Sequence, residues 1–188
     1  MSRVLLGSAE RLGCSERTLR RYVNDGLLQG RWVARRLELS DAEEDYLRRH
    51  WELLSSLRKA LRTEPGVRLA VLFGSTAIGD DDSSSDVDLL IVNRDHAPRA
   101  PIAVKLRLRH ALDRPVHVVS LEQAETMPTL LADVLREGRV LVDRDELWAA
   151  LQGRRKEVSV AAKREESATA TRAREAVAAS RERVAAAA

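Results

Sequence analysis

Two carboxylates that are two residues apart are the part of the chain best suited to chemistry. Asp86 and Asp88 flank Val87, and the apolar run at 89–92 (LLIV) follows them. Side chains two residues apart on a strand point to the same face, so we expect both carboxylates to lie together. Adjacent carboxylates repel each other unless a cation lies between them. Hard oxygen ligands suit Mg²⁺, which also accepts phosphate oxygens. The pattern therefore predicts a magnesium site that handles a phosphorylated substrate.

A Gly-Ser step stands upstream of this acidic pair. Gly74 and Ser75 follow the apolar segment Val67–Phe73, which is rich in β-formers and predicts a buried strand. Ten residues separate Ser75 from Asp86. Glycine allows the backbone to approach a ligand closely, and amides at the start of a helix favour anions. We therefore expect Gly74 and Ser75 to contact phosphate groups.

Taken together, these residues resemble the nucleotidyltransferase superfamily related to DNA polymerase β, in its minimal (MNT) form. The family motif is Gly-Ser, about ten residues, then Asp-x-Asp, and the resemblance covers roughly residues 67–143. It implies the α+β nucleotidyltransferase fold, with a small mixed β-sheet and helices. The order of the expected elements places those helices on one side of the sheet. The resemblance also implies two Mg²⁺ ions held by Asp86 and Asp88, and an NTP, ATP being expected, bound at Gly74 and Ser75. The implied reaction is transfer of an NMP from the NTP to a hydroxyl group.

The third carboxylate of the family has no counterpart in the matching segment, residues 114–119. His117 stands where an aspartate is expected. Imidazole is a poor Mg²⁺ ligand, so the second ion site is doubtful. Three alternatives remain open: two carboxylates suffice, His117 is a catalytic base near neutral pH, or catalysis is reduced or lost. The acidic run at 80–82 is expected to be a solvated loop.

The first 40 residues indicate a separate module. Ser15 is a suitable N-cap for a helix at 16–24, and Asp25-Gly26 ends that helix. A hairpin-like wing with a turn at Gln29-Gly30 is expected next. This segment resembles the winged helix-turn-helix of MerR-type regulators, which implies DNA contacts. The rival interpretation is a helical docking module that never meets DNA. The candidate DNA-binding residues are Arg17, Thr18, Arg20 and Arg21 on the helix, with Arg31, Arg35 and Arg36 on the wing.

The remaining segments are a linking helix and a C-terminal tail. Ser40 to Glu43 is a capping box, in which the glutamate reaches back to the cap, and Pro65-Gly66 ends the helix. The alanine-rich tail favours helix by propensity but offers few large apolar side chains, so it is either helical or disordered. We expect four segments: a module at 1–39, a linking helix at 40–64, a nucleotidyltransferase domain at 65–152 and the tail at 153–188.

Composition excludes several classes of protein. The 188 residues are 44% hydrophobic and 32% charged, with a net charge of +3, and contain one cysteine. No apolar run approaches the roughly 18 residues of a spanning helix, and no secretory signal is recognisable. The expected location is therefore cytoplasmic, without membrane contact. Aromatic residues make up only 3% of the chain, which argues against binding single strands through rows of stacked rings.

Two hypotheses follow for the whole chain. Resemblance to the small MNT proteins of toxin–antitoxin systems implies that the acceptor is a partner protein, a HEPN-type toxin, with DNA bound by the N-terminal module. The alternative is a DNA-binding regulator whose degenerate nucleotidyltransferase domain senses nucleotide or docks a partner. The oligomeric state stays open.

Overall fold

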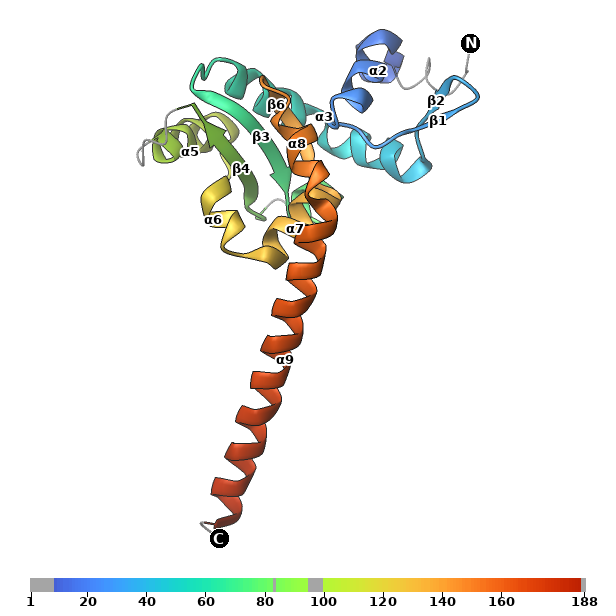
Figure 1. Cartoon of the computed structure of the whole chain (residues 1–188). Helices are drawn as coiled ribbons and strands as arrows, with labels where there is room; N and C mark the ends of the chain where they lie inside the picture. Colours follow the sequence, from blue (N-terminus) through green and yellow to red (C-terminus); the bar gives the residue numbers. More distant parts are fainter. Residues whose placement is uncertain (1–8, 83, 95–99, 187–188) are drawn as a thin grey trace.

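The computed structural model describes residues 9–82, 84–94 and 100–186 (Figure 1). Its described helices are α2 (Glu16–Asn24), α3 (Asp41–Arg62), α4 (Ser75–Ile78), α5 (Ala100–Leu112), α6 (Leu121–Glu125), α7 (Pro128–Glu137), α8 (Leu147–Gly153) and α9 (Arg155–Ala186). Its strands are β1 (Arg31–Val33), β2 (Arg36–Glu38), β3 (Val67–Phe73), β4 (Val87–Asn93), β5 (Val116–Ser120) and β6 (Arg139–Asp143). None of the helices in these ranges is long and apolar enough to cross a bilayer.

A four-stranded mixed sheet organises the centre of the chain, as the sequence predicts. Its strand order is β5-β4-β3-β6, with β4 parallel to β5 and β3 antiparallel to both β4 and β6. β3 is apolar on both faces, so both faces need cover. Leu72 lies in a core with α3 and α5, whereas Val71 lies in a second core with α7. The expectation of helices on one side only is therefore wrong.

The N-terminal segment shares its core with the central sheet. The side chain of Ser15 accepts a hydrogen bond from the Thr18 amide at 3.1 Å, which confirms the predicted N-cap of α2. Leu19, Leu27 and Leu37 are buried in the same cluster as α3 and β3. The N-terminal segment, α3 and β3 therefore pack around one apolar core.

The hairpin β1–β2 does not turn where the sequence indicates. Its turn is at Ala34 and Arg35, whose φ angles are 45° and 67°, rather than at Gln29-Gly30. Two consecutive residues with positive φ match the twist of a tight hairpin. Alanine and arginine give no sequence signal for that conformation, because glycine and asparagine normally adopt it. Arg36 is the first residue of β2, and Trp32 on β1 is exposed.

Helix α3 begins at the predicted cap, but only half of the capping box forms. The Ser40 hydroxyl accepts a hydrogen bond from the Glu43 amide at 3.2 Å. The Glu43 side chain does not return to Ser40; it binds Arg139 and the Gln29 amide instead. A buried guanidinium outcompetes the exposed cap amide, because an unpaired buried charge is far more costly.

The tail forms helix α9, one of the two alternatives that its composition left open. Val158 and Ala162 are buried, and Glu165 accepts hydrogen bonds from the amide and hydroxyl of Thr129. These contacts join the first turns of α9 to α7. From residue 166 to residue 177 the side chains are exposed, and Figure 1 shows the helix extending away from the body of the molecule.

Candidate active site

Three neighbouring strands bring the predicted site residues to one end of the sheet. Gly74 follows the last residue of β3, Phe73, which pairs with Asp88 on β4. Asp88 in turn pairs with His117 on β5. The strand register therefore brings together residues from positions 74, 88 and 117.

Gly74 is required by both its backbone and its surroundings. Its φ angle of 72° is one that side chains with a Cβ rarely adopt. A Cβ at this position would lie 2.6 Å from Oδ2 of Asp88, far inside contact distance. The missing side chain therefore lets the Asp88 carboxylate lie directly against the backbone at the end of β3. Ser75, at the start of α4, is partly exposed beside it.

Asp88 carries the electrostatic signature of the site. Burial raises the pKa of its carboxyl group; His117 lowers that pKa and Asp86 raises it. The net pKa lies above the ordinary value, which means that the charged form lacks sufficient stabilisation. Asp86 is exposed at the edge of β4, and the Thr76 hydroxyl donates to its backbone carbonyl at 3.1 Å.

Two adjacent carboxylates with one raised pKa fit a bound divalent cation, which would lower the cost of ionising both. Their donor set is all oxygen, as Mg²⁺ prefers. Among the residues that the structure describes, no group of three or more acidic, histidine or cysteine residues could hold a metal. Asp86 and Asp88 alone therefore fit one divalent cation. The second Mg²⁺ ion expected from the family resemblance has no third carboxylate to hold it.

His117 lies where the sequence places it, directly beside Asp88. Its Nδ1 is 3.4 Å from Asp88 Oδ1, and 59% of its side chain is exposed. A carboxylate oxygen only accepts, so this contact favours a proton on Nδ1 and leaves Nε2 as an acceptor. The catalytic role of His117 stays a prediction.

The acidic run at 80–82 is not the solvated loop that its composition suggests. Asp81 is almost fully buried, with 4% of its side chain exposed. His50 Nε2 lies 2.6 Å from its Oδ1, and Arg114 donates to its Oδ2 at 3.1 Å. Burial raises the pKa of Asp81, but the hydrogen bonds of His50 and Arg114 outweigh it and leave that pKa below its usual range. Sequence analysis could not find this cluster, because its members are more than 30 residues apart.

Arg114 connects this cluster to the candidate metal ligands. Besides Asp81, its guanidinium donates to the backbone carbonyl oxygens of Asp82 at 3.2 Å and Ser85 at 2.7 Å. Ser85 directly precedes Asp86. The loop that enters β4 is thus held by one arginine at the start of β5.

Arg139 contacts α4, on the side of the site away from Arg114, and the sequence analysis did not predict it. Its Nε donates to the Ala77 carbonyl of α4 at 2.6 Å, and its two terminal nitrogens lie 2.7 and 2.9 Å from Glu43. The guanidinium carbon is 3.5 Å from the ring centre of Tyr46. One buried side chain therefore ties the Gly-Ser helix to α3.

The candidate DNA-binding residues lie elsewhere and do not form one cluster. Arg17 is exposed; Arg20 pairs with Glu16 at 3.0 Å, and Arg31 pairs with Glu38 at 3.2 Å. The Thr18 hydroxyl is hydrogen-bonded to Ser15 at 2.9 Å. Arg21 lies apart from them, in a hollow against α3.

Comparison with known proteins agrees with this geometry. Residues 55–147 match the family model described as "Polymerase beta, Nucleotidyltransferase". No curated protein matches the sequence significantly.

Three solved structures illustrate the fold. A toxin–antitoxin complex with AMP-PNP contains a chain 24% identical to this one, with a TM-score of 0.53, over 64% of this chain and 97% of that one. A mutant MntA–HpeT toxin–antitoxin complex gives 22% identity, a TM-score of 0.54 and the same coverage. The structure of the tri-AMPylated Shewanella oneidensis HEPN toxin in complex with MNT antitoxin gives 21% identity and a TM-score of 0.51. The match covers 66% of this chain and 98% of that one.

At these identities the solved structures establish the fold, and the family model covers β3 and β4 with Gly74, Asp86 and Asp88 at their ends. Residues 55–147 are therefore similar to the polymerase β type of nucleotidyltransferase domain and share its fold.

Proposed function

We propose that the chain transfers a nucleoside monophosphate, AMP from ATP, to a hydroxyl group on a partner protein. The observation that carries this proposal is the Asp86–Asp88 pair, with the Asp88 carboxylate against the Gly74 backbone at the end of β3. The likeness to toxin–antitoxin complexes, one of which contains an AMPylated HEPN toxin, supports a HEPN-type toxin as the acceptor.

The reaction balances with the residues of this site. The acceptor hydroxyl oxygen forms a bond to the α-phosphorus, the bond from that phosphorus to the β-phosphate oxygen breaks, and pyrophosphate leaves. Bound Mg²⁺ on Asp86 and Asp88 would supply charge stabilisation of the phosphates and a lower pKa of the hydroxyl. In this proposal the backbone of Gly74 and the partly exposed Ser75 contact the phosphates.

His117 accepts the proton of the acceptor hydroxyl in this proposal. Its Nδ1 faces Asp88, so Nε2 is the nitrogen left to take a proton, and its exposure lets a macromolecule reach it. This arrangement of a carboxylate that orients an imidazole is a recurrent one in general base catalysis.

The test measures label transfer from α-labelled ATP to a HEPN-type partner with Mg²⁺. Asp86→Asn and Asp88→Asn should each lose transfer entirely. His117→Ala should lower the rate of transfer about 10²-fold. Full activity in His117→Ala would refute the base role and leave two carboxylates sufficient. Full activity in Asp88→Asn would refute the proposed reaction.

We also propose that the N-terminal segment binds DNA. The observations in its favour are the exposed Arg17 and Arg20 on a capped helix, and the exposed arginine in the turn of the β1–β2 hairpin. A gel shift with upstream DNA should weaken at least tenfold in Arg17→Ala/Arg31→Ala, since phosphate contacts dominate such affinity. Arg136→Ala, on the surface of α7, is the matched control. If both variants bind the DNA equally well, the proposal that the N-terminal segment binds DNA is wrong.

A further inference from the structure

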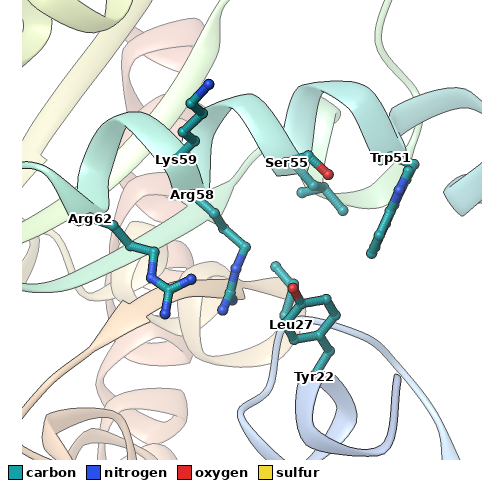
Figure 2. Close-up of a pocket in the computed structure, with 8 residues that line it drawn as sticks. Tyr22, Leu27, Trp51, Ser55, Arg58, Lys59 and Arg62 are labelled. Carbon is teal, nitrogen blue, oxygen red and sulfur yellow. The ribbon is translucent and has the colours of Figure 1, made fainter. Parts of the chain in front are cut away.

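A hollow between α2 and the last turns of α3 has no part in the reaction proposed above. Its volume is about 250 Å³, and Tyr22, Leu27, Trp51, Arg58 and Arg62 line it. Figure 2 shows Arg58 and Arg62 projecting from α3 to the side of Tyr22 and Leu27, whereas Lys59 points the other way. A second hollow of about 790 Å³ shares Arg58 and Arg62 and adds Arg21 and Arg144. The two hollows form one groove.

The arginines that α2 and α3 contribute to this groove make no ion pair in the described part of the chain, although the carboxylates of Asp25, Asp143 and Glu146 also line the larger hollow. Within the described ranges, Arg21, Arg58 and Arg62 are without such a pair, whereas Arg20, Arg114 and Arg139 each have one. Burial lowers the pKa of Arg58, Tyr22 and Asp25 raise it, and Arg62 and Arg21 lower it. Like charges four residues apart on a helix also repel each other. Such an arrangement is stabilised when an anion enters.

The groove is also shaped for a particular kind of anion. The Arg58 guanidinium carbon lies 4.5 Å from the ring centre of Tyr22, so its orientation is partly fixed before a ligand arrives. The Tyr22 and Trp51 rings are 5.9 Å apart and tilted by 51° to each other, and they form an aromatic wall of the groove. Paired guanidinium groups match phosphate oxygens in a bidentate manner, and an aromatic wall suits a sugar or base.

The groove is separate from the candidate active site. Arg62 lies just before β3, and Val142 and Asp143, which line the larger hollow, pair with the first half of β3. Gly74 and Asp88 lie at the opposite end of that strand. The two ends of a seven-residue strand are roughly 20 Å apart.

We propose that this groove binds the phosphate of a nucleotide, either free or at the end of a nucleic acid strand. Arg58 and Arg62 hold the phosphate, Arg21 adds charge from α2, and Tyr22 and Trp51 flank the sugar or base. A ligand held here would contact both the N-terminal segment and α3. The proposal does not depend on the proposed transfer reaction.

Calorimetric titration of the full chain tests the proposal. EDTA is present, so that the Asp86–Asp88 pair holds no metal. The probes are adenosine, AMP and a 5′-phosphorylated oligonucleotide of ten residues. The variants are Arg58→Gln/Arg62→Gln and, as a matched control on the same helix, Arg48→Gln, whose arginine pairs with Asp45. Thermal melting checks that each variant is folded. If the double variant unfolds, Arg62→Gln alone is used in its place, because the Arg62 side chain is exposed.

The expected result is binding of a phosphorylated probe that weakens tenfold or more in the double variant, and severalfold in Arg62→Gln, but not in Arg48→Gln. Adenosine should bind much more weakly than AMP. If AMP binds more tightly than the oligonucleotide, the groove is a site for a free nucleotide. If the oligonucleotide binds more tightly, the groove is a site for the end of a strand. Equal affinities in the double variant and the control would overturn the proposal, as would no binding of either phosphorylated probe at millimolar concentration.

Discussion

Asp81 and Asp88 are seven residues apart in sequence, yet the protein treats their charges in opposite ways. Asp81 has a lowered pKa because His50 and Arg114 stabilise its charge despite burial. Asp88 has a raised pKa because burial disfavours its charge and Asp86 repels it. Asp81 thus has a charge that its partners stabilise, whereas Asp88, the proposed metal ligand, has a charge that lacks such partners.

Asparagine substitutions should separate the two roles. Asp81→Asn should reduce the free energy of unfolding by about 1–3 kcal/mol at pH 7, since its charge-assisted hydrogen bonds are lost. The pKa of Asp81 is lower in the folded state, so its contribution exists above the unfolded value near 4 and vanishes as pH falls through the folded value. The deficit of Asp81→Asn should therefore shrink in acid.

When no divalent metal is present, Asp88→Asn should not reduce the free energy of unfolding as Asp81→Asn does. The folded-state pKa of Asp88 is raised, so the folded state binds protons more readily and loses stability as pH rises through that pKa. Removing the charge should leave the melting temperature at pH 7 unchanged or higher. Denaturation in EDTA measures both variants, and a loss in Asp88→Asn as large as that in Asp81→Asn would contradict this account.

Sequence reasoning predicted site residues only where a contiguous motif marks them, and it did not indicate residues that only folding brings together. Gly74, Asp86 and Asp88 stand at a recognisable spacing, and His117 follows from its place on the next strand. Asp81 and Arg139 carry no local signal, because their partners are as far as 96 residues away.

At the scale of elements, α3 connects the N-terminal segment to the active-site helix. Glu43 accepts hydrogen bonds from the Gln29 amide and from Arg139, which also donates to α4. Capping chemistry predicted where α3 and α2 begin, since a serine before a helix is a local signal. The turn of the β1–β2 hairpin was mispredicted, because Ala34 and Arg35 adopt positive φ angles that their residue types do not signal.

Glu43→Gln should be strongly destabilising, by about 3–5 kcal/mol, because it leaves the Arg139 charge buried and unpaired. Both side chains are only 3% exposed. The neighbouring Glu44, which pairs with the exposed Arg11, is the matched control. Glu44→Gln should cost less than about 1 kcal/mol. Urea denaturation compares the two variants, and equal losses would show that the buried pair does not organise this junction.

At the scale of the whole molecule, one apolar core runs from the N-terminal segment through α3 to the sheet. Leu19, Leu37, Leu54 and Leu72 belong to the same buried cluster. The sequence indicates separate segments, because charge and motif change along the chain, and it cannot show that their apolar faces meet. We expect the intact chain to unfold in a single transition.

Truncations should therefore have unequal effects. Deleting residues 1–39 exposes the α3 leucines to water and should abolish cooperative unfolding of the remainder. Deleting residues 171–188 is the matched control: the described side chains at 171–177 are exposed, so the melting temperature should change by less than about 2 °C. Cooperative melting of residues 40–188 at the original temperature would show that the shared core is dispensable.

The central claim is that the Asp86–Asp88 site transfers a nucleoside monophosphate. The most direct measurement compares ATP labelled at the α-phosphate with ATP labelled at the γ-phosphate, in the presence of Mg²⁺ and a HEPN-type partner. The account predicts that α-label alone appears on the partner, with an equal amount of pyrophosphate, and that both products disappear in Asp86→Asn. Transfer of γ-label, or α-label transfer that persists in Asp86→Asn, would contradict it.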